Sequence, residues 1–268
     1  MIQKELFDRL WTDYTTKNPH AKNIFKAFAD RGEQVLNDHI AFRTINQAGM
    51  NIDTLAQAFI EAGYVEKGRY VFESKKLQAR HYEIPNDDTA PLVFISELET
   101  ELFSSFLQQE MKKIAEQMPE DLKNNPNIIF SGRTWGLPSF AVYEKLRTES
   151  EYAAWFYVNG YTVNHFTVSV NQLKTMTNIA DVNAFLKEQG YQINDAGGEV
   201  QGTPEELLEQ SSVKAPLMEV EFQEGVFEVP GCYYEFAKRY NDADGKLYRK
   251  FIAKSADKIF QSTDYYRS

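Results

Sequence analysis

Two of the four histidines in the chain stand in segments that have the alternating pattern of a β-strand. His39 lies in "NDHIAFRTIN", residues 37–46, and His165 lies in "VNHFTVSVN", residues 163–171. Alternation puts His39 and Arg43 on one face of the first segment. A neutral imidazole is a common ligand of transition metals, and a guanidinium matches a carboxylate with two parallel hydrogen bonds. The first segment therefore combines a candidate metal ligand with a candidate anion-binding group.

Each histidine segment is followed by a second matching pattern. "IDTLAQAFIEAGY" follows the first and "IADVNAFLKEQGY" follows the second, and both read as amphipathic helices that end at Gly-Tyr. The glycine comes 24 residues after His39 and 25 residues after His165. This recurrence predicts two copies of one supersecondary unit. If the copies pair about a pseudo-two-fold axis, the two histidines converge on one point.

A carboxylate from the last part of the chain is expected to complete the site. Glu219 and Glu221 share one face of "LMEVEF", which suits a solvated or a cleft-lining face. Glu235 lies inside the aromatic run "CYYEFAKRY", where an unpaired buried carboxylate is costly and a metal removes that cost. With the two histidines it forms the facial triad that binds Fe(II), although other partners would suit Zn(II), Mn(II) or Ni(II). The alternatives are histidines that are only hydrogen-bonded in a barrel interior, and an ion pair between Glu235 and Arg239.

Further residues carry weaker signals. Arg43 is expected to bind a substrate carboxylate, unless it pairs with an internal carboxylate such as Glu83 or Glu221. His81 alternates with Glu83 and either lines the cleft as a hydrogen-bond donor or is an ordinary core or surface histidine. Ser255, in "IAKSADKIF", most simply caps the helix that follows it. Arg133 and Trp135 lie in a glycine-flanked loop and receive no role.

Composition narrows the class of protein. The single cysteine, Cys232, excludes an internal disulfide and a cysteine-rich zinc site. A formal net charge of −10 and a pI near 5.0 disfavour nucleic acid and anionic lipid as partners, so an anionic ligand needs a local cation such as Arg43. The charged start "MIQKELFDRL" and the lack of a long apolar stretch predict a cytoplasmic protein without a membrane span.

The order of elements predicts a single catalytic domain of the α+β class. We expect N-terminal helices over residues 1–34, a first βαβββ module over 35–97, a mainly helical insertion over 98–159 and a second module over 160–268. The two modules are expected to form a half-barrel with a metal cleft. Within the second module, "TPEELLEQ" suggests a short helix, and "APLMEVEFQE" and "GCYYEFAKRY" read as strands.

Four segments in order resemble one known family. "DHIAFRT", "VNHFTVSV", "YYEFAKRY" and "FIAKSADKIFQST" look like the 2-oxoadipate dioxygenase/decarboxylase family of the vicinal oxygen chelate superfamily. This resemblance implies Fe(II) held by His39, His165 and Glu235, with Arg43 gripping the substrate and a further substrate contact near residues 253 to 255. It also implies that 2-oxoadipate and O2 are converted to 2-hydroxyglutarate and CO2.

Two rival functions stay open at this stage. A non-redox isomerase or lyase of the same fold would use the metal only as a Lewis acid. A small-molecule-binding protein on the same scaffold would dispense with the metal. The sequence leaves the chain length of the substrate, the stereochemistry, the pathway and the oligomeric state open.

Overall fold

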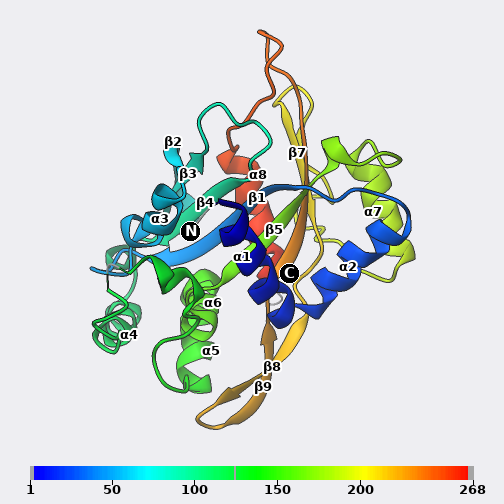
Figure 1. The fold of residues 1–268 in the computed structure, drawn as a ribbon. Helices are drawn as coiled ribbons and strands as arrows, with labels where there is room; N and C mark the ends of the chain where they lie inside the picture. The colour runs from blue at the N-terminus through cyan, green and yellow to red at the C-terminus, as the bar shows by residue number, and fades with distance from the viewer. Residues whose placement is uncertain (1–2, 124, 265–268) are drawn as a thin grey trace.

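The computed structural model describes residues 3–123 and 125–264 and is built around one curved sheet of eight strands (Figure 1). The outer ends of the predicted ranges 1–34 and 160–268 lie outside these described residues. The first half of the sheet comes from β1 (Asn37–Ile45), α3 (Ile52–Glu61), β2 (Val65–Phe72), β3 (Leu77–Glu83) and β4 (Leu92–Leu98). The second half comes from β5 (Val163–Ser169), α7 (Ile179–Glu188), β6 (Gln201–Thr203), β7 (Leu208–Ser212) and β10 (Tyr233–Arg239).

The strand order has the same form in both halves of the sheet. It reads β2-β3-β4-β1 and then β5-β10-β7-β6, so the two first strands meet at the centre and the second strands form the two edges. β4 runs parallel to β1, β10 runs parallel to β5, and β1 and β5 are antiparallel to each other. The predicted α+β fold with two βαβββ units in a half-barrel is therefore confirmed, and we propose that the two halves are equivalent modules.

The central pairing brings the candidate ligands together. Along β1 and β5, His39 pairs with Thr167 and Ala41 pairs with His165, which places the histidines on neighbouring strands and offset by two residues. On the other side of β5, Glu235 pairs with Thr167. The three side chains therefore come from three adjacent strands at one level of the sheet.

The two halves differ at one corresponding position. In β10, Glu235 pairs with the residue two positions after His165. In β4, Phe94 pairs with the residue two positions after His39. Phe94 thus occupies in the first half the place that Glu235 occupies in the second.

Side-chain alternation separates the two faces of the central strands. α1 (Gln3–Lys17) and α2 (Pro19–Asp30) cover one face, where the ring of Tyr14 lies 5.0 Å from Phe166 and the ring of Phe28 lies 5.9 Å from Phe236. Because successive strand residues point to opposite faces, His165 and Glu235 point away from these helices. The helices therefore supply the core that fixes the strands, and the opposite face holds the polar cluster.

The C-terminal segment crosses that opposite face (Figure 1). α8 (Ala253–Ile259) contacts β2 in one half of the sheet and β6 and β7 in the other, and η5 (Phe260–Thr263) follows it directly. The segment therefore bridges the edges of the two halves and closes the concave side.

The region between the two halves is helical, as predicted. Its elements are η2 (Thr100–Leu102), α4 (Ser105–Glu116), η3 (Pro126–Phe130), α5 (Phe140–Glu149) and α6 (Glu151–Asn159). Shorter 3-10 turns follow β2 and β5, at η1 (Glu73–Lys75) and η4 (Val170–Gln172). No helix within residues 3–123 and 125–264 is both long and apolar enough to cross a bilayer.

Two details of the second half differ from the prediction. "TPEELLEQ" is not a helix: it contains the end of β6, a turn with Leu207 at a φ of 65°, and the start of β7, where the alternating side chains Leu208 and Gln210 are buried. "LMEVEF" is a strand, β8 (Leu217–Phe222), but it pairs only with β9 (Gly225–Pro230) in a separate hairpin. Glu219 and Glu221 are exposed on that hairpin, so neither belongs to the cluster at the sheet centre.

Gly160 generates the first testable prediction, because it turns the chain from α6 into the strand that carries His165. Its backbone has φ 63° and ψ −140°, and a Cβ there would lie 2.4 Å from the carbonyl oxygen of Gly132. Gly160→Ala should therefore lower the free energy of unfolding by about 2–4 kcal/mol, measured by urea denaturation. Gly136→Ala is the control, since a Cβ at that position has no neighbour within 4 Å. Equal stability of the two variants would contradict this account.

Candidate metal centre

Three buried side chains converge at the centre of the sheet. His39, His165 and Glu235 each offer one donor atom, and these three atoms lie within 4.8 Å of one another. Nε2 of His39 is 3.5 Å from one carboxylate oxygen of Glu235, and Nε2 of His165 is 3.1 Å from the other. Two donors about 2.1 Å from one ion lie roughly 3.0–3.4 Å apart at octahedral or tetrahedral angles. The distances from the carboxylate to the two imidazole nitrogens are therefore close to those of ligands that share one divalent cation.

The residue before each histidine orients its ring. Nδ1 of His39 lies 2.8 Å from Oδ1 of Asp38, and Nδ1 of His165 lies 3.0 Å from Oδ1 of Asn164. An acceptor at Nδ1 favours the tautomer that leaves Nε2 without a proton, which is the form that binds a metal. Both imidazoles thus turn Nε2 toward Glu235.

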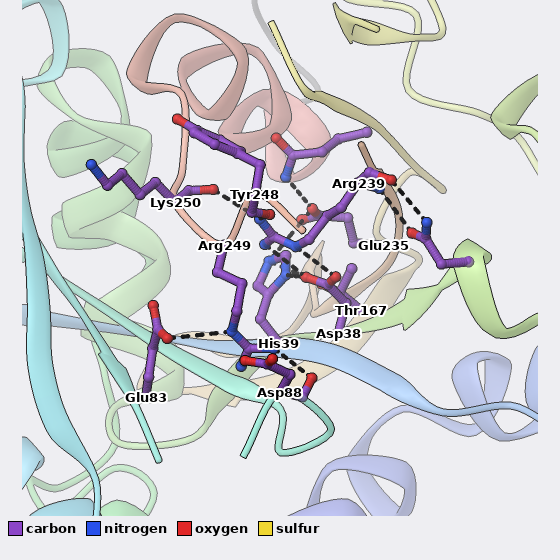
Figure 2. Close-up of polar contacts among 12 residues, drawn as sticks. Asp38, His39, Glu83, Asp88, Thr167, Glu235, Arg239, Tyr248, Arg249 and Lys250 are labelled. Carbon is purple, nitrogen blue, oxygen red and sulfur yellow. Dashed lines mark hydrogen bonds and ion pairs between the residues drawn. The ribbon is translucent and has the colours of Figure 1, made fainter. Parts of the chain in front are cut away.

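Asp38 is itself held by a second buried charge, as Figure 2 shows. Nε and Nη2 of Arg239 donate to the two oxygens of Asp38 at 2.8 and 2.9 Å, and Nη1 donates to the carbonyls of Tyr248 and Lys250 at 3.1 and 2.8 Å. Burial raises the pKa of Asp38, but the charges of Arg239 and His39 outweigh it and hold the pKa below its usual range. The alternative in which Arg239 pairs with Glu235 is therefore wrong, because its guanidinium binds Asp38.

Glu235 has no lysine or arginine within ion-pair distance among the described residues. The residue is 1% exposed, and burial raises its pKa to about 7. Oε1 accepts a hydrogen bond from Nε2 of Gln210, whereas Oε2 is buried and has no hydrogen-bond partner among the described residues. A buried carboxylate beside two imidazole nitrogens needs a cation to offset its charge. This donor set fits a divalent transition metal.

The cluster borders a small cavity. Phe94, Phe251, Ala256, Ile259 and Phe260 form its apolar wall, and Tyr233 and Gln210 line it beside the three candidate ligands. The ring of Tyr233 stacks on His165 at 4.5 Å, and its buried hydroxyl has no hydrogen-bond partner in the described part of the chain. The cavity volume is about 20 Å³, enough for one water molecule but far below the space of a six-carbon diacid. The three candidate ligands are at most 4% exposed, so the candidate centre is shielded from bulk water.

Arg43 lies on the same sheet face as His39, as predicted, and is 1% exposed. Its Nη1 donates to Glu151 at 3.0 Å, its Nη2 donates to Thr263 at 3.0 Å, and its buried Nε has no hydrogen-bond partner in the described residues. Arg43 therefore does pair with an internal carboxylate, as the alternative interpretation had it, but the carboxylate is Glu151 and not the suggested Glu83 or Glu221.

The remaining candidates lie near the cavity without lining it. His81 is fully buried, with its nitrogens 2.9 Å from the hydroxyl of Tyr70 and 2.9 Å from Glu83, so both of its polar atoms are occupied within the protein. Ser255 does not cap a helix, because α8 begins at Ala253 and Ser255 sits within its first turn. Ser255 is buried, and its Oγ would lie 3.3 Å from a Cβ placed on Gly202 of β6. Substrate contacts by these two residues stay proposals.

The loop residues and the cysteine have structural contacts. Nη1 of Arg133 donates to the carbonyl of Val158, and the indole of Trp135 donates to the carbonyl of Tyr157, both at 2.9 Å. These bonds fasten the loop to α6. Burial raises the pKa of Cys232 to about 12, so its thiol is not activated as a nucleophile.

Asp38, Asn164, Gln210, Tyr233 and Arg239 were not recognised as partners of the site from the sequence. A signal existed for the first two, because an acceptor side chain precedes the histidine in both repeats, in "DH" and in "NH". Gln210 carried no such signal, because the pattern of its segment, "TPEELLEQ", predicts a helix.

Comparisons with known proteins agree with this arrangement. The model of the 2-oxoadipate dioxygenase/decarboxylase family matches residues 6–125 and 128–246. The chloroplastic 2-oxoadipate dioxygenase/decarboxylase of Arabidopsis thaliana is 35% identical over an alignment of 285 positions, gaps included, which covers 97% of this chain and 77% of that protein. The chain belongs to this family. The resemblance found in the four sequence segments is thereby confirmed.

Two solved structures share the whole fold. The hydroxyglutarate synthase of Oryza sativa, crystallised in complex with 2-oxoadipate, is 31% identical with a TM-score of 0.91, covering 98% of this chain and 93% of that one. A Shewanella frigidimarina protein, provisionally described as a hydrolase, is 46% identical with a TM-score of 0.88, covering 94% of this chain and 98% of that one. The family assignment therefore extends to the three-dimensional structure.

Metal binding provides a direct test of the cluster. His165→Ala and Glu235→Ala should each weaken Mn(II) or Fe(II) binding by about 100-fold or more, because a direct ligand should matter at least as much as its supporting partners. Binding is measured by anaerobic titration calorimetry and by metal analysis. His20→Gln is the histidine control, since His20 lies in α2 outside the cluster. Full metal affinity in both alanine variants would remove this cluster as the metal centre.

Asp38 gives a second test of the site. Asp38→Asn keeps an acceptor for His39 but removes the charge that Arg239 binds, so metal affinity should fall about 10- to 100-fold. Stability should also fall, by about 3–5 kcal/mol, because a buried guanidinium loses its partner. Asp53→Asn is the matched control, since it breaks a more exposed pair with Arg80. Unchanged metal affinity would show that Asp38 does not orient the ligand.

Proposed function

We propose that this protein is an Fe(II)-dependent dioxygenase that decarboxylates a 2-oxo diacid, with 2-oxoadipate as the preferred substrate. The reaction is 2-oxoadipate plus O2 to 2-hydroxyglutarate plus CO2. The observation that carries the proposal is the buried cluster of His39, His165 and Glu235 in a chain of the 2-oxoadipate dioxygenase/decarboxylase family. Two imidazoles and one carboxylate form the donor set of non-haem Fe(II) oxygenases.

The chain's own residues would have separate tasks. His39, His165 and Glu235 would hold the metal, and Asp38 and Asn164 would keep the two imidazoles in the binding tautomer. Iron, when bound, supplies a Lewis acid for the 2-oxo-carboxylate end of the substrate and a redox centre for O2. The apolar wall of the cavity, which includes Phe251 and Phe260, would exclude water from the reacting groups.

Arg43 would bind the far carboxylate of the diacid. It is a buried guanidinium on the face of His39; burial lowers the pKa of His165, and the charge of Arg43 adds to this shift. A guanidinium in a dry cleft favours a carboxylate strongly, because its fork donates two parallel hydrogen bonds. This contact would separate a diacid from a monoacid. His81 and Ser255 are proposed as more distant contributors to the substrate site.

Two finer points belong to the proposal. Fe(II) is the metal we expect for the reaction, and the same donors would also bind Zn(II), Mn(II) or Ni(II) in a purified sample. A cytoplasmic location is proposed for this chain, although its Arabidopsis relative is named chloroplastic.

Oxygen uptake tests the proposed function. The protein loaded anaerobically with Fe(II) should consume one O2 and release one CO2 for each 2-oxoadipate, with 2-hydroxyglutarate as the product. A series of 2-oxo acids of different length would define the preferred substrate. Turnover of a carbonyl substrate without oxygen would favour a non-redox isomerase, lyase or hydrolase instead. A protein that binds the diacid but retains no metal after anaerobic purification would be a binding protein.

Arg43 separates substrate binding from chemistry. Arg43→Ala should leave metal content intact and lower kcat/KM for a 2-oxo diacid by about 30- to 1000-fold, since a charge-assisted bidentate contact contributes roughly 2–4 kcal/mol. A 2-oxo monoacid of similar length should lose much less, and Arg43→Lys should restore only part of the activity. Steady-state kinetics with both substrates is the measurement, alongside thermal unfolding. Equal losses for diacid and monoacid would remove Arg43 from the substrate site.

A further inference from the structure

A second and larger cavity lies next to the cavity at the candidate metal centre. Its volume is about 360 Å³, which is within the range of small-molecule sites, and its lining includes Lys75, Glu151, Tyr152 and Asp264. Phe260 lines both cavities and so forms a wall between them. We call this larger cavity the vestibule. It is the adjoining space through which a diacid could approach the inner cavity.

Glu151 stands between the vestibule and Arg43. Its carboxylate lines the vestibule and also accepts from Nη1 of Arg43 at 3.0 Å. Thr263 contacts both groups, because its hydroxyl accepts from Nη2 of Arg43 and donates to Glu151. The Glu151 side chain is 14% exposed, whereas that of Arg43 is 1% exposed. An internal carboxylate therefore occupies the guanidinium that the far carboxylate of a substrate requires.

Lys75 also lines the vestibule and is a second cation near the carboxylate of Glu151. It belongs to η1, between β2 and β3, and no hydrogen-bonding or ion-pair partner engages its ammonium among the described residues. Burial lowers the pKa of Lys75, and Glu151 is the charge that opposes this shift most, ahead of Asp257. Glu151 thus has two cations near it, and among the described residues Arg43 is hydrogen-bonded to it whereas Lys75 is not.

We propose that Glu151 changes its partner when a diacid binds. The far carboxylate of the incoming diacid takes the place of Glu151 on Arg43, and Glu151 moves to Lys75. The inference rests on the proposed function, because it assigns the far carboxylate to Arg43. It is carried by three groups: a guanidinium that is already occupied, a carboxylate that lines the vestibule and pairs with this guanidinium, and an ammonium in the same lining that has no hydrogen-bond or ion-pair partner among the described residues.

The charges explain why a second cation is needed. Two carboxylates sharing one buried guanidinium would repel each other, and Glu151 without a partner in a half-buried site would be costly. Lys75 removes this cost, since moving Glu151 to the ammonium leaves one anion on each cation. A monoacid offers no far carboxylate and leaves Glu151 where it is. The exchange would therefore add discrimination in favour of diacids beyond the contact with Arg43 itself.

The test is a double-mutant cycle on the Fe(II)-loaded enzyme with a 2-oxo diacid and a 2-oxo monoacid. Glu151→Gln removes the competing charge, so KM for the diacid should fall about 5- to 30-fold while KM for the monoacid stays the same. Lys75→Met removes the second resting place of Glu151, so KM for the diacid should rise by about tenfold with little change for the monoacid. In the Glu151→Gln background, Lys75→Met should have almost no further effect, because Lys75 acts only through Glu151.

Matched controls come from the same cavity. Glu149 lines the vestibule but binds the backbone amide and hydroxyl of Ser104, and Lys76 donates to the carbonyl of Leu102 over the ring of Phe103. Glu149→Gln and Lys76→Met should leave both KM values near those of the parent enzyme. If Glu151→Gln does not fold, Glu151→Asp replaces it, because the shorter carboxylate should weaken the pairing and lower the diacid KM in the same direction.

The outcomes separate this inference from the proposed function. A tenfold rise in diacid KM from Lys75→Met in both backgrounds would mean that Lys75 acts on the substrate directly, which overturns the exchange. A diacid KM that does not fall in either Glu151 variant would also overturn it. Failure of the proposed function itself would show in the parent enzyme, as no oxygen uptake with any 2-oxo acid. The same cycle can also be measured without turnover. Calorimetry then measures the binding of a plain dicarboxylate that has no 2-oxo group.

Discussion

The antiparallel pairing of β1 with β5 is the contact on which the site depends. It joins the two halves of the sheet through backbone hydrogen bonds and sets the register in which Ala41 faces His165. A shift of one residue in this register would turn His39 toward the helices α1 and α2, because successive strand residues point to opposite faces. The aromatic packing of Tyr14 and Phe166 on the helix side opposes such a shift. The apolar core on one face thus determines where the polar groups meet on the other.

The sequence predicted the parts of this arrangement that follow from periodicity and repetition. The recurrence of strand, helix and Gly-Tyr located both histidines and implied their convergence, and the aromatic surroundings of Glu235 indicated a buried carboxylate that needs a cation. The partner of Arg43 could not be predicted, because Glu151 is 108 residues away at the start of a helix and no local pattern links the two. The pairing of β6 with β7 was missed for another reason. "TPEELLEQ" has helix-favouring residues, but the positive φ of Leu207 and the buried positions of the sheet edge override that local preference.

Arg239 and Arg249 connect the candidate metal centre to the segment that covers it. Arg239 reaches Asp38 on one side and the carbonyls of Tyr248 and Lys250 on the other, and Arg249 extends the same segment to Glu83 and to the carbonyl of Asp88 (Figure 2). The segment then continues to Phe251, whose ring meets His39 at 4.9 Å. The guanidinium of Arg239 therefore holds both the orientation of His39, through Asp38, and the position of the segment that leads to Phe251 in the cavity wall. A shift of the covering segment should therefore alter the orientation of His39, and a change at His39 should alter the position of that segment.

Phe94 shows how the symmetry of the two halves is broken. It occupies the place in β4 that Glu235 occupies in β10, and both side chains line the inner cavity. A fully symmetric duplication would put a carboxylate at both positions and surround the cavity centre with two histidines and two glutamates. With phenylalanine in one copy, the first half contributes a single donor and an apolar wall. Under the proposed equivalence of the two halves, matching strands supply the paired histidines, and Phe94 puts an apolar ring where the other half has a carboxylate, which leaves that position to the donor of a bound small molecule.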